Sequence, residues 1–83
     1  MATKSEARLD LIYSALSDPS RRLILQRLSQ GEATVGDVSA PLRVSAPSVS
    51  KHLKVLEHAG LIGRRVEGRK HYLFLKADAS PQP

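Results

Sequence analysis

Residues 49–70 read VSKHLKVLEHAGLIGRRVEGRK, and this stretch decides the fold. Val49, Leu53 and Leu56 recur at intervals of four and three residues, which places them on one face of an α-helix. Gly60 then supplies the left-handed conformation in which helices commonly end. We therefore expect an amphipathic helix that buries these three side chains and ends at the glycine.

Beyond the glycine, the stretch continues as a basic hairpin. Residues 61–66 and 69–75 have the composition and alternation of two short strands. Glu67-Gly68 lies between them and is expected at the hairpin tip, because the glycine offers the positive φ angle that a tight turn needs. A helix followed at once by such a hairpin predicts a mainly α (α+β) winged helix-turn-helix, with about four helices followed by a two-stranded β-hairpin wing.

Three further helices are expected before residue 45. Asp18-Pro19 is typical of a helix start, because aspartate accepts hydrogen bonds from the first turn and proline suits the first helical position. The helix that begins there would turn Leu23, Ile24 and Leu28 inward. The expected helices cover about residues 4–16, 19–29, 35–41 and 45–59.

The composition excludes several classes of protein. A chain of 83 residues forms one small domain, which buries a modest core and gains stability from dimerisation. It has no cysteine, which excludes disulfides and thiolate metal sites and suits a reducing cytosol. No apolar run approaches the roughly 20 residues of a membrane span, and the N-terminus lacks a signal-peptide apolar region. We expect a cytoplasmic protein without a membrane partner, with one domain at residues 1–76 and a disordered tail at 77–83.

The formal net charge of +5 is unevenly distributed. Residues 1–42 carry five basic and five acidic side chains, whereas residues 43–76 carry eight basic and two acidic ones. A neutral half joined to a strongly basic half favours a polyanionic partner such as nucleic acid. Many basic surfaces are merely solvated, so the charge alone does not decide the partner.

The first helix carries apolar side chains on more than one face. A deeply buried helix would explain this pattern. In so small a chain, however, we favour a helix that packs on its own domain and also on a partner subunit. The expected dimer-interface residues are Leu9, Leu11, Ile12, Tyr13 and Ala15.

The fourth helix carries polar side chains opposite its apolar stripe. In a helix-turn-helix, the N-terminal half of the second helix enters the major groove of DNA. Small hydroxyls allow a close approach to bases or phosphates, and lysine reaches guanine acceptors. Serine caps and a solvated lysine face are the alternative explanation. The candidate DNA-binding residues here are Ser48, Ser50, Lys51, His52 and Lys54.

The hairpin is also basic, with Arg64, Arg65, Arg69 and Lys70 near its tip. Such charge suits phosphates or a narrow minor groove, although it can also serve to keep an edge strand soluble. Arg69 is our first choice for entry into the minor groove, because it follows the glycine at the tip.

Three segments resemble the ArsR family of bacterial winged-helix repressors: DPSRRLILQRL at residues 18–28, SAPSVSKHLKVLEHAGLI at 45–62 and VEGRKHYL at 66–73. With the first helix, the resemblance covers roughly residues 8–75. It implies a homodimer that represses transcription by binding an imperfect inverted repeat near a promoter and leaves the DNA on receiving a signal. The family's DNA contacts, carried onto this sequence, fall on Ser48, Ser50, Lys51, His52 and Lys54 in the helix and on Arg65, Arg69 and Lys70 in the wing.

Two departures from the family pattern concern that signal. Many metal-sensing members have a cysteine pair in the third helix, where residues 34–38 here read TVGDV. Others bind zinc on a long C-terminal helix, whereas only Asp78 offers a ligand beyond the wing. His52, His58 and His71 lack paired ligand spacing on one helix face. We therefore expect no metal site and no cofactor, and the inducer stays unknown.

Two other functions compete with a DNA-binding repressor. A winged-helix protein–protein interaction module without specific DNA binding would use the same basic face to meet an acidic partner. An enzyme is the weaker competitor, because the chain has no glycine-rich phosphate loop and no clustered carboxylate pair. Ser50 and His52 are two residues apart and do not project together from a helix. We expect no catalytic residues and a sequence-specific transcriptional repressor.

Overall fold

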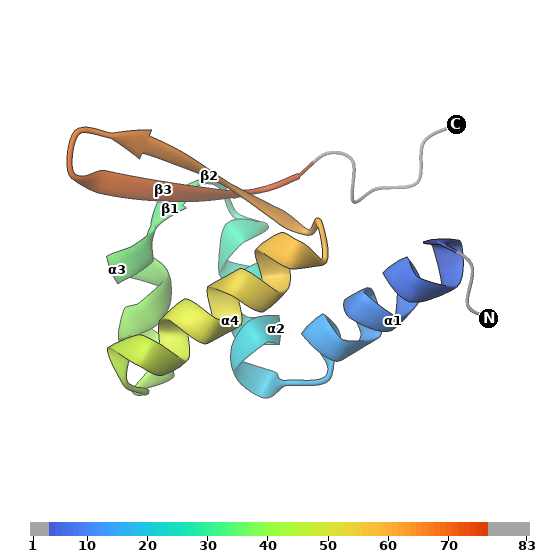
Figure 1. The fold of residues 1–83 in the computed structure, drawn as a ribbon. Helices are drawn as coiled ribbons and strands as arrows, with labels where there is room; N and C mark the ends of the chain where they lie inside the picture. Colours follow the sequence, from blue (N-terminus) through green and yellow to red (C-terminus); the bar gives the residue numbers. More distant parts are fainter. Residues whose placement is uncertain (1–3, 77–83) are drawn as a thin grey trace.

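A computed structural model of the protein describes residues 4–76. A layer of helices is covered at one end by a β-hairpin that extends past it (Figure 1). The expected tail at residues 77–83 lies outside the described residues. The elements are α1 (Lys4–Leu16), α2 (Pro19–Leu28), β1 (Ala33–Thr34), α3 (Val35–Ser39), the short 3-10 helix η1 (Ala40–Leu42), α4 (Ala46–His58), β2 (Ile62–Glu67) and β3 (Lys70–Leu75).

The predicted winged helix-turn-helix is confirmed, with one difference in the third helix. We expected this helix to reach Pro41, but α3 ends at Ser39 and continues as the tighter η1. Proline has no N–H to donate and its ring clashes with the preceding turn, so an α-helix does not continue through Pro41. Arg43 then takes a left-handed conformation, with φ of 54°, and turns the chain toward α4.

The sheet has three strands rather than the two expected. Its order is β1-β3-β2, and β1 pairs with β3 through Ala33 opposite Leu73. A strand of two residues has no periodicity to read, which is why the sequence pattern did not reveal it. Through this pairing, the wing is attached to the segment between α2 and α3.

The hairpin tip is shifted by one residue from the prediction. Glu67 and Lys70 are paired across the hairpin, so the loop is Gly68-Arg69 and not Glu67-Gly68. Gly68 has a φ of 59°, whereas Arg69 has a negative φ. Glycine at the first loop position is typical of a type II′ turn. The shift places Arg69 at the extreme tip of the wing.

One hydrophobic core joins the helices to the base of the wing. The predicted apolar stripe of α4 is confirmed, since Val49, Leu53 and Leu56 are all buried. In α2, Ile24 and Leu28 are buried as expected, but Leu23 is half-exposed at 50%. The inward stripe passes through positions 24 and 28, and Leu23 lies off that stripe. The full core comprises Ala15, Ile24, Leu28, Ala33, Val38, Val49, Leu53, Leu56, Ala59, Ile62 and Leu73.

Two glycines orient the wing on this core. Gly60 has a φ of 76° and ends α4, as predicted. Gly63 is buried in β2 opposite Phe74, and a Cβ at this position would overlap the Phe74 ring. The ring therefore packs directly on the backbone of β2, which holds the two strands close above the helices.

Candidate nucleic-acid interface

The start of α4 is defined by a serine cap. Ser45 is extended, and its Oγ accepts a hydrogen bond from the Ser48 backbone N–H at 3.3 Å. The same Oγ donates to Ser48 Oγ at 3.0 Å, and Ser48 is half-buried. Pro47 lies in the first turn, where a helix does not use the N–H of the residue. This cap determines which side chains the exposed face of α4 presents.

Three of the predicted contact residues form that exposed face. Ser50, Lys51 and Lys54 are all exposed, and within residues 4–76 their side chains have no hydrogen bond or ion pair. Lys51 and Lys54 are three positions apart on the helix and therefore neighbours on its surface. The charges of Lys51 and Lys54 therefore have no ion-pair partner among the described residues, and they lie beside the hydroxyl of Ser50.

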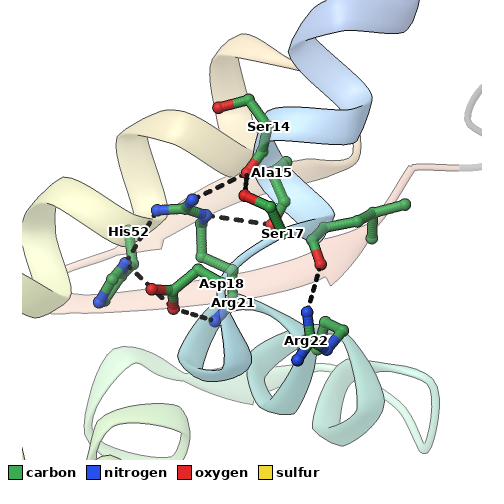
Figure 2. Close-up of polar contacts among 8 residues, drawn as sticks. Ser14, Ala15, Ser17, Asp18, Arg21, Arg22 and His52 are labelled. Atoms are coloured by element: carbon green, nitrogen blue, oxygen red, sulfur yellow. Dashed lines mark hydrogen bonds and ion pairs between the residues drawn. The ribbon is translucent and has the colours of Figure 1, made fainter.

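His52 is placed differently from these residues. Its side chain is only 14% exposed, with Nδ1 3.3 Å from Arg21 Nη1 and 3.9 Å from Asp18 Oδ2. Figure 2 shows these three side chains pointing toward one another. His52 lies at the edge of the predicted groove face and is engaged by the corner between α1 and α2.

Arg21 connects that corner to α4. Its Nε donates to the Ala15 carbonyl at 3.0 Å and its Nη2 to the Ser14 carbonyl at 2.8 Å (Figure 2). Arg22 Nη1 donates to the Leu16 carbonyl at 2.6 Å. The last carbonyls of an α-helix have no partner within the helix. Both arginines therefore cap α1, and Arg21 contacts α4 as well.

Asp18 starts α2 in the way the sequence predicted. Its Oδ2 accepts a hydrogen bond from the Arg21 backbone N–H at 3.1 Å. Partial burial acts to raise the pKa of the Asp18 carboxyl, but the Arg21 N–H and the neighbouring His52 act together to lower it below its usual value. Asp18 therefore favours its charged form in the folded protein.

The two arginines at the base of the wing are held by internal ion pairs. Arg64 Nη2 and Nε lie 2.6 Å and 3.0 Å from Glu57 Oε1 on α4. Arg65 Nη2 lies 2.6 Å from Glu32 Oε1, and its Nη1 lies 2.7 Å from Glu67 Oε1. Hydrogen bonds to Glu32 and then Glu67 raise the pKa of Arg65 above its usual value. Arg65 was predicted to contact DNA, but its guanidinium is engaged within the protein.

Arg65 is also fixed by an aromatic ring. Its Cζ lies 4.7 Å from the centroid of Tyr72 on β3, which is the geometry of a cation–π contact. This contact joins β2 to β3 within the wing, and the Glu32 pair joins the wing to the loop before β1.

The tip of the wing is different from its base. Arg69 and Lys70 are exposed, and the described part of the chain offers neither a hydrogen bond nor an ion pair to their side chains. They border an open depression of about 690 Å³ that Thr34 and Asp37 of the α3 region also line. These two predicted contacts are therefore available to an external anion.

The predicted dimer surface is only partly exposed. Leu9, Tyr13 and Leu16 are exposed along one face of α1, with Tyr13 at 66%. Ala15 was assigned to this surface, but it is fully buried in the chain's own core and is not accessible to a partner. Position 15 lies on the α1 face that packs against α2 and α4. Leu11 is exposed at 37% and Ile12 is half-buried.

Among residues 4–76, no group of three or more His, Cys, Asp or Glu side chains is arranged to hold a metal ion. Over the same residues, no helix is long and apolar enough to cross a membrane.

The arrangement of helices and wing defines a winged helix-turn-helix protein, and comparison with known proteins agrees. Residues 18–63 match the family described as "Bacterial regulatory protein, arsR family". The chain is 39% identical over 64 residues to the transcriptional repressor SdpR of Bacillus subtilis, covering 77% of this chain and 71% of that protein. It is 44% identical over 61 residues to the HTH-type transcriptional regulator Rv2034 of Mycobacterium tuberculosis, covering 74% of this chain and 57% of that one.

Solved structures show the same likeness. The crystal structure of an ArsR family transcriptional regulator superposes with a TM-score of 0.82 at 38% identity, covering 86% of this chain and 78% of that one. The chain belongs to the ArsR family of bacterial, DNA-binding transcriptional regulators.

Proposed function

We propose that the protein represses transcription by binding an inverted-repeat operator as a homodimer. One observation carries the proposal. The exposed cations of α4, Lys51 and Lys54, and those of the wing tip, Arg69 and Lys70, have neither a hydrogen bond nor an ion pair among the described residues. Protein cations that contact phosphates displace the counterions condensed on DNA, and this release supplies a large share of the affinity for DNA.

In this proposal the N-terminal half of α4 enters the major groove. Ser50, Lys51 and Lys54 face the DNA, and Ser48 lies at its edge because its hydroxyl takes part in the helix cap. Lys51 is the best placed to read guanine O6 and N7, since it combines exposure with a position in the first half of the helix. His52 is left out of the groove, because its ring is engaged with Arg21 and Asp18.

The wing contacts the minor groove or the backbone through its tip. Arg69 is one of the two loop residues, and Lys70 begins the returning strand. Arg65 has a supporting role in this proposal, since its pairs with Glu32 and Glu67 hold the hairpin against β1.

The homodimer is proposed to form through the outer face of α1. Leu9, Tyr13 and Leu16 recur at four and three residues and form a stripe that the chain itself does not cover. Leu11 and Ile12 border that stripe. Two-fold symmetry would place the recognition helices about 34 Å apart, so half-sites should be roughly one turn of DNA apart.

Fluorescence anisotropy with duplex DNA from upstream of the protein's own coding region tests this proposal. We expect an inverted repeat to bind more tightly than random duplex, with affinity that falls steeply with salt.

Lys51→Ala should weaken operator binding by about 1–3 kcal/mol and relax sequence preference. Lys76→Ala removes one exposed charge away from the interface and should leave specificity unchanged. Equal affinity for operator and random duplex would favour the protein–protein module instead.

Sedimentation velocity tests the dimer separately. Tyr13→Asp places a charge in the exposed α1 stripe and should shift the protein toward a folded monomer, because Tyr13 is mostly exposed and its loss leaves the core of the monomer intact. Leu23→Asp, which alters a half-exposed leucine on α2, is the matched control and should stay dimeric. A dimer unchanged by Tyr13→Asp would place the interface elsewhere.

A further inference from the structure

We propose that the groove between α1 and α4 binds an amphipathic organic anion, an acid with an apolar body, and that this ligand competes with DNA. The competition rests on the proposed DNA-binding role of α4, whereas the binding site itself does not. The groove is open and has a volume of about 1000 Å³, at the upper end of the range for small-molecule sites.

One part of the groove is apolar. Leu11 of α1 and Pro47 and Val55 of α4 contribute apolar surface to its lining. Leu11 is 37% exposed and Val55 is half-buried, so both keep apolar surface in contact with water. Covering this surface with an alkyl or aryl group would be favourable, because it removes apolar area from water.

The other part of the groove is positively charged. Lys51 and Lys54 line it, and neither has an internal partner among residues 4–76. Glu57 is the acidic residue of the lining, but its Oε1 already accepts two hydrogen bonds from Arg64, at 2.6 Å and 3.0 Å. The Arg64 pair therefore leaves the lysines as the effective charge of the groove, and an anion is the complementary ligand.

The combination of both parts identifies the class of ligand. A DNA strand would satisfy the lysines but has no need for an apolar wall at Leu11 and Val55. A cationic or neutral apolar molecule would leave the lysines unpaired. A carboxylate or sulfonate attached to an apolar body uses both walls. Ser50, Lys51 and Lys54 line this site and also form the face of α4 that is proposed to contact DNA. The helix would therefore not bind such a ligand and DNA at the same time.

Isothermal titration calorimetry of the full chain with decanoate tests the site. We expect saturable binding of decanoate and much weaker binding of acetate, which lacks the apolar body, and of decyltrimethylammonium, which has the opposite charge. Lys54→Gln should weaken decanoate binding about two- to fivefold, as expected for an exposed ion pair. Lys76→Gln, away from the groove, should leave it unchanged.

A second variant tests the apolar wall. Val55→Thr keeps the shape of the side chain and should weaken decanoate binding about threefold, the value of roughly one buried methyl group. Leu11→Ser serves the same purpose if Val55→Thr lowers the melting temperature. The proposal is overturned if decanoate does not bind, if it binds no better than the cation, or if neither wall affects it.

DNA competition separates this inference from the proposed function. At constant ionic strength, decanoate should raise the apparent Kd for operator DNA, whereas acetate should not. Arg69→Ala should weaken DNA binding and leave decanoate binding unchanged, because Arg69 does not line the groove. Decanoate binding without operator binding would overturn the proposed function and the competition but retain the ligand site. Operator binding without decanoate binding would retain the proposed function and overturn the ligand site.

Discussion

The base and the tip of the wing carry similar charges but differ in what neutralises them. At the base, Arg64 is paired with Glu57 and Arg65 with Glu32 and Glu67. At the tip, Arg69 and Lys70 have neither a hydrogen bond nor an ion pair within the described residues, and Lys70 has only an electrostatic attraction to Asp37. The base arginines join the hairpin to α4 and to the loop before β1, and the tip cations are left for an external anion. Positive charge in the sequence therefore does not by itself identify a binding residue.

The same division is found on the helices. Arg21 is paired with carbonyls of α1 and with His52, whereas Lys51 and Lys54 on α4 have no hydrogen bond or ion pair in the part of the chain that the structure describes. Internally paired cations hold the recognition elements in place, and unpaired cations are proposed to meet the DNA. If this comparison is right, substitutions of paired cations should mainly lower stability. Substitutions of unpaired cations should mainly lower DNA affinity and its dependence on salt.

The largest effect on DNA binding is expected at the tip. The double variant Arg69→Ala/Lys70→Ala removes two proposed charge-assisted contacts and should weaken operator binding on the order of a hundredfold. It should also reduce the slope of log K against log salt by about two, since each phosphate contact contributes roughly one. Thermal stability should change little, because neither side chain has a hydrogen bond or an ion pair within residues 4–76 and Lys70 has only an electrostatic attraction to Asp37. Anisotropy titrations across salt concentrations, with a thermal melt, provide both measurements.

Arg64→Ala is the matched control at the base. It removes an exposed ion pair and should cost at most about 1 kcal/mol of stability. The salt slope should stay close to that of the wild type. A slope reduced as much as in the tip variant would mean that base and tip share the same role, and the comparison would fail.

An intermediate effect is expected at Arg21. Arg21→Ala removes hydrogen bonds to the Ser14 and Ala15 carbonyls and the contact with His52. The free energy of unfolding should fall by about 1–3 kcal/mol, because hydrogen bonds from charged groups contribute in that range. Operator affinity should fall as α4 loses this support, while the salt slope stays unchanged. Denaturant unfolding and salt titrations of the same variant measure the two quantities.

Arg21→Lys refines this test. Lysine keeps the charge but lacks the planar guanidinium that reaches two carbonyls and His52 together. It should therefore behave like Arg21→Ala in unfolding. Full rescue by lysine would show that charge alone matters at this position, contrary to a positioning role.

Regular patterns in the sequence predicted much of the fold. The stripe of Val49, Leu53 and Leu56, the Asp18 cap and the Gly60 stop were all confirmed, because each depends on residues within one or two helical turns. The strand β1 was missed, since two residues carry no period. The tip was misplaced by one residue, since the position of a hairpin loop depends on strand register, which is set across the sheet.

The pairing of charged side chains was not predictable in the same way. Arg65 and Glu32 are separated by 33 residues, and Arg21 and His52 by 31. Such pairs depend on how helices and strands meet in three dimensions, and no local spacing indicates them. The burial of Ala15 has a similar origin, because it depends on which face of α1 meets α4. The sequence could name the basic residues but not separate the paired from the unpaired ones.

The smallest effect is expected at Asp18, whose carboxylate lies beside the paired Arg21 and His52. Its contribution to stability should depend on pH. The folded protein lowers the pKa of Asp18 below its usual value of about 3.9. Its charged form therefore stabilises the fold above that pH, and this contribution is lost as the pH falls through the folded-state pKa.

Asp18→Asn keeps a good helix cap but removes the charge. The wild type should melt at a higher temperature than Asp18→Asn near pH 5, and the difference should shrink toward pH 3. Asp18→Ala also removes the cap and should melt lower at every pH. Wild-type and Asp18→Asn curves that stay parallel down to pH 3 would show that the charge of Asp18 does not contribute to holding this corner together.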